Sequence, residues 1–243
     1  MTIFEQHIDF KFKVDKVASF TKEDFNVAEI DWLLNEGQNV FTKQRYGTSN
    51  NTRSGFETTQ KRIDDLASLH VKFPEQPAIV ATTVTSGVHE VVLSDLIHSY
   101  WFLTRGYVTV SQTDCPDKNI KLRQIDNDDL SDALGDSFHQ SSVLDGVLCN
   151  FGKASATTGE SSIYIYPGTL TIGDVFIEYI KKPVQMFYGG YTYIDGSTPT
   201  TTNCELPEHT HSEIVDIAVN IAAGIIEHPT YAQLKQQKVF KHE

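Results

Sequence analysis

Hydrophobic positions recur every three or four residues near both ends of the chain, whereas apolar and polar residues alternate in its middle. The most apolar stretch covers residues 206–228. Its apolar face contains Ile214, Ile217, Ala218, Ile221 and Ile225, and is widened by Val215, Val219, Ala222 and Ile226. A helix that is apolar around most of its girth must be covered by other helices or by a neighbouring subunit. We therefore expect this helix to be the centre of a helical core.

Both ends of this helix carry sequence signals. Pro207 suits the first turn, where the N–H that proline lacks would have no helical partner. Thr210 and Glu213 form a Thr-x-x-Glu capping box as an alternative start. His228 precedes Pro229, and a residue before proline avoids the helical region, so we expect the helix to end there.

Two more helices are predicted in the first seventy positions, at residues 25–46 and 56–70. Helical spacing places apolar residues of the longer one on a single face. That face contains Ile30, Leu33, Leu34, Val40 and Phe41. Lys43 and Arg45, near its end, are expected to be solvated and not part of a basic patch.

Residues 3–20 show a different pattern, in which apolar and charged residues alternate. The apolar positions are Ile8, Phe10, Phe12 and Val14. Alternation of this kind predicts a half-buried strand or an extended arm. Such a strand could add to another chain or belong to the chain's own sheet, and the sequence leaves both alternatives open.

From residue 71 the chain becomes rich in β-branched residues, with prolines and glycines between short runs. The predicted strands cover residues 78–84, 90–93, 107–112, 118–125, 147–151, 163–166 and 175–180. The turn at 114–117 predicts a hairpin, and short helices are expected within 93–106 and at 128–134. A Gly/Thr-rich connector at 188–205 then leads to the last helix.

These elements predict an α+β protein. Its N- and C-terminal helices are expected to form a bundle that carries an inserted antiparallel β domain. The helical bundle domain would comprise residues 1–70 and 205–243, including the N-terminal extended arm. The β domain would comprise residues 71–204.

Composition limits the classes of function. A chain of 243 residues with 40% hydrophobic residues can bury a sizeable core. A net charge of −12 argues against broad binding to nucleic acid or to an anionic membrane. Neither a signal peptide nor a transmembrane span is predicted. The three cysteines, Cys115, Cys149 and Cys204, are odd in number and far apart, which favours free thiols in a reducing compartment.

Two clusters resemble metal sites without meeting their requirements. His209 and His211, near Glu208 and Glu213, lie two positions apart, so at a helix start they point in different directions. The acidic cluster comprises Asp126, Asp128, Asp129, Asp132 and Asp136. Counted from its first residue, it lacks the glycine and glutamate that an EF-hand loop requires. We therefore expect no metal site and no cofactor.

Catalytic motifs are not found either. The sequence has no GxSxG motif and no phosphate-binding glycine loop. Cys149 lies in an apolar predicted strand, which favours a core residue over a nucleophile. We expect no catalytic residue and no enzyme activity.

Three stretches together resemble the neck, or ring, proteins of crAss-like tailed bacteriophages. EIDWLLNEGQNVFTKQRYG at residues 29–47 resembles their first helix, and VFIEYIKKP at 175–183 resembles the strand that ends their β region. ELPEHTHSEIVDIAVNIAAGIIE at 205–227 resembles their closing helix. The order and spacing agree from about residue 25 to the C-terminus.

The resemblance implies a structural virion protein, a subunit of a head–tail connector ring below the portal. It implies twelve copies, with the portal protein and other neck and tail ring proteins as partners. DNA would pass nearby without specific binding, and no membrane would be involved. The protein would be made in the cytoplasm of the bacterial host and would act in the neck of the virion.

A different class of function remains an alternative. Phe187, Tyr188, Tyr191 and Tyr193 could form a platform on which sugar rings stack. In that case the chain would be a tail accessory module that recognises a host surface glycan through its β domain.

Overall fold

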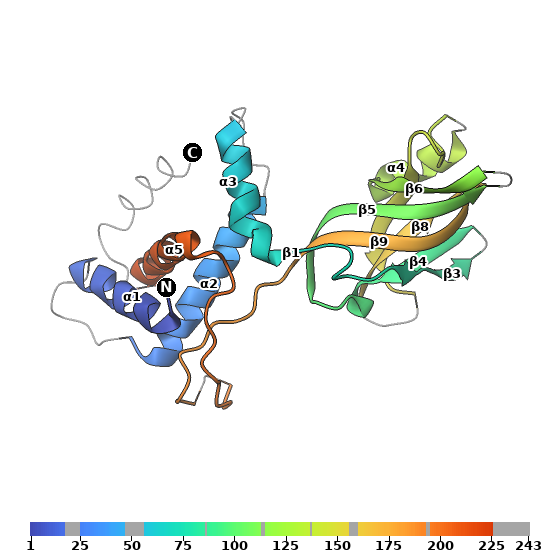
Figure 1. Ribbon diagram of the computed structural model, residues 1–243. Coiled ribbons are helices and arrows are strands. Elements are labelled where there is room, and N and C mark those ends of the chain that lie inside the picture. Colours follow the sequence, from blue (N-terminus) through green and yellow to red (C-terminus); the bar gives the residue numbers. More distant parts are fainter. Residues whose placement is uncertain are drawn as a thin grey trace. The chain divides into compact units, whose positions relative to one another are not determined.

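The computed structural model describes residues 1–17, 25–46, 56–85, 87–112, 115–136, 138–155, 160–192 and 195–225 (Figure 1). Five α-helices and a curled mixed β-sheet occur in these residues, which confirms the α+β class. The chain divides into two compact units. We call Met1–Leu69 with Pro183–Glu243 the helical unit, and His70–Lys182 the β unit.

The helical unit begins with a helix, α1 (Ile3–Val17), so the predicted N-terminal strand or extended arm is wrong. A capping box starts this helix: Thr2 N donates to Glu5 Oε2 at 2.8 Å, and Glu5 N donates to Thr2 Oγ1 at 3.3 Å. Ile3 and Phe10 are buried at helical spacing, whereas Phe12 is largely exposed. The alternation that suggested a strand therefore does not coincide with the buried face.

Helix α2 (Val27–Tyr46) confirms the predicted first long helix, and α3 (Phe56–Leu66) continues into the short 3-10 helix η1 (Ala67–Leu69). The buried face of α2 includes more polar residues than the pattern predicted. Its buried residues are Ile30, Asp31, Leu33, Leu34, Gly37, Gln38, Phe41 and Thr42. The polar loop predicted at 48–55 lies outside the described residues.

The closing helix, α5 (His211–Ile225), follows a 3-10 turn, η3 (Glu208–Thr210). Thr210 Oγ1 donates to Pro207 O at 2.8 Å, so it closes the 3-10 turn and does not form the predicted capping box. Ile214, Val215 and Ala218 are fully buried, whereas Ile225 is exposed. The predicted end at His228 lies outside the described residues.

Helices α2 and α5 approach each other closely at Gly37. A Cβ atom at this position would lie 2.8 Å from Ile214 O and 3.2 Å from Ala218 N. Only glycine lets the backbone of α5 come this near to α2. The contact explains why glycine, which has a low helix propensity, occurs in the interior of α2.

A polar ladder joins α2 to the connector, which we define as residues 183–207. Asn35 Nδ2 donates to Met186 O at 2.9 Å, and Met186 N donates to Asn35 Oδ1 at 2.8 Å. Tyr188 N donates to Asp31 Oδ2 at 3.0 Å, and Gln38 Nε2 donates to Val184 O at 3.3 Å. Side chains of the helix thus bind the main chain of the connector as a neighbouring strand would.

The spacing of this ladder follows from the geometry of the two segments. Four residues of helix, from Asp31 to Asn35, rise about 6 Å. Two residues of extended chain, from Tyr188 to Met186, span about 6.6 Å. The three residues from Asn35 to Gln38 rise only about 4.5 Å. That shortfall agrees with the longer hydrogen bond at Gln38.

Asp31 is the most connected residue of the ladder. It is 0% exposed, and besides Tyr188 N it accepts a hydrogen bond from Tyr191 Oη. His7 Nε2 on α1 lies 2.7 Å from Asp31 Oδ1 and must donate, because a carboxylate only accepts. One buried carboxylate therefore binds α1, α2 and the connector together.

The described residues of the β unit form nine strands in one sheet. They are β1 (His70–Val71), β2 (Ile79–Val80), β3 (Thr82–Thr85), β4 (Val88–Val92), β5 (Tyr100–Gln112), β6 (Cys115–Gln124), β7 (Val147–Lys153), β8 (Ser161–Tyr166) and β9 (Thr171–Lys181). Their order is β1-β9-β5-β6-β7-β8-β4-β3, and β2 also pairs with β9. Because β2 and β3 follow each other closely, residues 79–85 contact both ends of the sheet and curl it towards closure.

The predicted strands are found, but the sheet is mixed and not antiparallel as expected. The β5–β6 hairpin is antiparallel as predicted, whereas β6 and β7 are parallel, with Leu122 opposite Val147. The connection between them contains α4 (Asn127–Gly135) and is long enough to return the chain to the same end of the sheet. The helix predicted within 93–106 is a single 3-10 turn, η2 (Leu93–Asp95).

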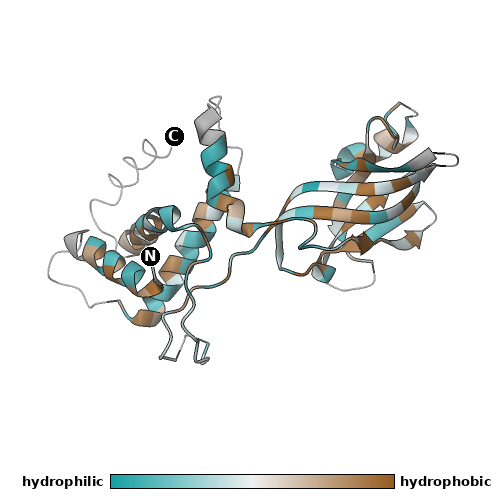
Figure 2. Cartoon of the chain, viewed as in Figure 1, coloured by the Kyte–Doolittle hydropathy of each residue, from teal (hydrophilic) through white to brown (hydrophobic). Residues whose placement is uncertain are grey.

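Alternate residues of the strands fill the interior of the curled sheet. Hydropathy changes repeatedly along β5 and β9 (Figure 2). Val175, Ile177 and Tyr179 of β9 are at most 1% exposed and pack with Val108 and Val110 of β5. The intervening residues of both strands therefore form the outer face of the sheet.

Replacing Gly37 with alanine should destabilise the protein by about 1–3 kcal/mol, because the added methyl group overpacks the contact with α5. Urea unfolding followed by circular dichroism measures this change. Gly135→Ala is the matched control, since a Cβ there meets no atom within 4 Å. Equal unfolding midpoints for the two variants would contradict the close approach of α2 and α5.

Replacing Asp31 with alanine should cost about 3 kcal/mol, because three buried donors lose their charged acceptor. The connector should also detach, so chymotrypsin should cleave after Tyr188 or Tyr191 faster than in the unmodified protein. Glu36→Ala, a half-buried carboxylate on the same helix, is the control. If both variants resist chymotrypsin equally, Asp31 does not anchor the connector.

Candidate functional site

The histidines that resembled a metal site lie at the start of the closing helix and make separate contacts. His209 Nε2 lies 2.7 Å from Asp65 Oδ1 on α3. His211 Nε2 lies 2.8 Å from Leu206 O, within its own turn. Each ring therefore orients a local segment, and the two do not converge on one point.

The predicted acidic cluster lies on α4 and the loop that follows it. Asp126, just before α4, and Asp128, Asp129 and Asp132 within it are exposed. Asp136 accepts a hydrogen bond from Phe138 N at 3.0 Å, and this bond, with His139 beside it, lowers the pKa of its carboxyl group. Within the described ranges, no three His, Cys, Asp or Glu side chains are placed to hold one metal ion.

Two described cysteines are free thiols, of which Cys149 is buried and Cys204 is partly buried. Cys149 lies in β7 inside the sheet, where burial raises the pKa of its thiol to about 12. Burial also raises the pKa of Cys204, in the connector, to about 11. A buried thiol with a raised pKa is a poor nucleophile at neutral pH. The side chain of Cys115 lies outside the described residues.

The aromatic residues considered as a sugar platform are used within the helical unit. Tyr188 and Tyr191 bind Asp31, and the Tyr188 ring lies 5.1 Å from the ring of His7. Phe187 pairs through its main chain with Thr202. Tyr193 lies outside the described residues. Tyr188 and Tyr191 therefore hold the connector on α2. This role does not favour the glycan interpretation.

A second polar network was not predicted, because Arg45 was expected to be solvated. Arg45 Nε lies 2.7 Å from Asp65 Oδ2, a fully buried carboxylate on α3, and the same guanidinium binds Glu213 on α5. Lys61 Nζ adds an ion pair with Glu213 at 3.0 Å. This network joins α2, α3 and α5, and it explains why Glu213 is largely covered although it is charged.

One sequence pattern indicates the residues that bind the helical unit together. Asp31, Asn35 and Gln38 recur at spacings of four and three, which places them on one helix face beside the apolar residues. Polar residues at helical spacing on an apolar face indicate partners that need hydrogen bonds. The sequence does not indicate that those partners are main-chain groups of the connector.

The surface of the helical unit offers an apolar groove along α1. Phe4, Ile8 and Phe12 follow one another at every fourth position and are about half exposed or more. Ile8 and Phe12 line a groove of about 460 Å³ with Ser212 of α5. A surface of this kind is suited to contact with another protein rather than to chemistry.

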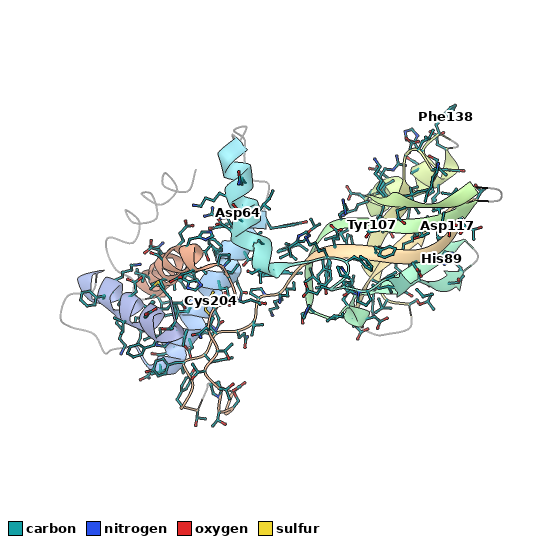
Figure 3. The ribbon with its side chains drawn as sticks, in the orientation of Figure 1. Asp64, His89, Tyr107, Asp117, Phe138 and Cys204 are labelled. Carbon is teal, nitrogen blue, oxygen red and sulfur yellow. The ribbon has the colours of Figure 1, made fainter. Side chains whose placement is uncertain are left out.

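The β unit presents apolar residues at the loop between α4 and β7. Phe138 is 87% and Leu144 is 92% exposed. Arg123 holds the loop by donating to His139 O at 2.6 Å, and Ser142 pairs with Gly146. Figure 3 shows Phe138 extending from this end of the unit, away from Tyr107 on β5. Large apolar side chains on an anchored loop are typical of contacts between subunits.

Comparison with known proteins agrees with this surface-based reading. None of the helices in the described part of the chain is long and apolar enough to cross a membrane. No curated protein matches the chain. The model of the family described as phage tail ring protein 3/4 matches residues 1–235, nearly the whole chain. The chain therefore belongs to the phage tail ring protein 3/4 family and is a structural ring protein of crAss-like bacteriophages.

Proposed function

We propose that this protein forms a closed ring of twelve copies in the neck of the virion, below the portal. There it joins the capsid to the tail and forms part of the DNA conduit. The portal protein and other neck and tail ring proteins are its partners, and synthesis takes place in the cytoplasm of the host. It acts by assembly, without catalysis or a cofactor.

Family membership over residues 1–235 is the observation that carries this proposal. A ring of many identical copies closes only through head-to-tail contacts, in which two different surfaces of the subunit meet. The described chain offers separate apolar surfaces for such contacts, at Phe4 and Ile8 on α1 and at Phe138 and Leu144 in the β unit.

The negative charge of the chain supports a position around a channel through which DNA slides. The chain carries a net charge of −12, and four aspartates of the α4 region are exposed. Tight binding to DNA requires clustered lysine and arginine side chains that release counterions from phosphates. An acidic wall repels phosphates and therefore lets the duplex slide past.

Cryo-electron microscopy of intact particles tests the location and the copy number together. We expect density for this chain in a twelve-fold ring of the neck, between the portal and the tail. Its absence from the neck, or a ring with another number of copies, would refute the proposal. In a gel-shift assay at low salt, the purified protein should not retard duplex DNA, and retardation would contradict the role proposed for its charge.

We also propose that the β unit is an inserted domain. Its strands pair with one another, and its buried cluster runs from Val71 to Tyr179. Main-chain groups of the connector form hydrogen bonds with α2, which supports an end of the inserted domain at Lys182 rather than at residue 204.

Residues 70–182, produced alone, should fold and unfold in one cooperative transition, because this fragment keeps every strand of the sheet. Circular dichroism during thermal unfolding is the measurement. A fragment of residues 70–166 is the control, since it lacks β9, the partner of β1, β2 and β5. If the longer fragment is as unfolded as the shorter one, the β unit is not an independent domain.

A further inference from the structure

The outer face of the sheet carries an apolar patch that crosses β2, β9 and β5, together with the turn after β1. We call Phe73, Val80, Tyr107 and Phe176 the outer-face patch. We propose that the outer-face patch is one of the two different surfaces through which one copy of the chain contacts the next copy in the ring. This inference rests on the proposed ring.

Strand register places these side chains on one face. Val80 is opposite Asp174, and Tyr107 is opposite Phe176, so each pair points to the same side. Asp174 and Phe176 are two residues apart in β9 and share that side. The neighbours Val175 and Ile177 point into the core, which confirms that the patch faces outward.

Contacts between the aromatic side chains make the aromatic part of the patch continuous. The Phe73 and Phe176 rings lie 5.4 Å apart in an edge-to-face arrangement. Phe176 and Tyr107 are stacked, with centroids 4.7 Å apart and planes inclined by 10°. The Arg105 guanidinium covers Tyr107 at 5.5 Å from the ring centroid. These contacts order the aromatic side chains before any partner binds, which lowers the entropy cost of association.

The same contacts argue against a sugar as the occupant. A sugar ring stacks on the open face of an aromatic ring, but Tyr107 and Phe176 use their faces against each other. Arg105 covers Tyr107 further, and Phe73 contacts Phe176. The rings therefore offer edges and not a flat platform, which suits packing against protein side chains.

Charges around the patch fit a second copy. Asp174 and Glu178 lie on β9, and Arg105 and Lys121 lie on β5 and β6. Arg105 Nη2 pairs with Glu178 Oε1 at 2.7 Å within the chain. Two acidic and two basic groups cancel, although the whole chain has a charge of −12 that makes copies repel one another. Such a neutral, apolar region is where two copies can approach at least cost.

Exposure shows that the patch is open at its edge. Val80 is 81% and Phe73 is 51% exposed, while Phe176 and Tyr107 are partly covered by their neighbours. An exposed valine in a strand contributes little to folding, so a charge at Val80 should leave the subunit intact. A glutamate there would, however, be buried without a partner if another copy covers it.

Val80→Glu in the full-length protein tests the proposal. Rings formed by the purified chain, alone and with the portal protein, are counted by negative-stain electron microscopy and weighed by mass photometry. We expect the fraction in rings to fall at least about tenfold, since an unpaired charge weakens every contact of the ring. The subunit should stay folded, with an unfolding midpoint lowered only slightly, because the new carboxylate lies opposite Asp174.

Two variants serve as controls. Val84→Glu makes the same substitution at another exposed valine of the same unit, on β3 at the opposite end of the strand order, and should form rings as the unmodified protein does. Val80→Thr keeps the branched shape without a charge and should also form rings. If Val80→Glu forms rings normally, or if Val84→Glu loses them to the same extent, the outer-face patch is not a contact between copies. If the unmodified chain forms no ring under either condition, the proposed ring itself fails, and this inference fails with it.

Discussion

The buried carboxylate of Asp31 is the interaction on which the helical unit depends. It has no contact with water, so each of its oxygens must accept hydrogen bonds from the protein. The donors come from His7 on α1 and from Tyr188 and Tyr191 in the connector, segments that are far apart in the sequence. Apolar packing can bring helices together in several registers, whereas a buried charge accepts only the arrangement that satisfies it.

Periodicity predicted those elements whose buried face is apolar throughout. Helix α5 and strands such as β7 and β9 were identified because their side chains repeat at the period of their structure. Helix α1 was missed because Ile8, Phe10 and Phe12 alternate by chance, while the capping box at Thr2 and Glu5 went unnoticed. The parallel pairing of β6 and β7 could not be predicted, since it depends on how the α4 connection returns the chain.

The surfaces proposed for assembly could not be predicted from the sequence either. Val80 lies in a run of β-branched residues that predicts a buried strand, and only the register with Asp174 places its side chain outside. Phe138 and Leu144 stand alone among polar residues, so no periodic signal marks them. Periodicity identifies the apolar face of a helix or strand. It does not show whether the same chain or another molecule covers that face.

The two chain crossings between the units leave the sheet from paired strands. One crossing enters at β1 and the other leaves after β9, and His70 is paired with Ile180. A tensile force between the units would therefore act on two covalent strands in parallel, from the same end of the pair. Neither strand of this pair would be pulled past the other, so the two crossings would share the load. The hydrogen bonds between β9 and β5 would then pass that load to the rest of the sheet.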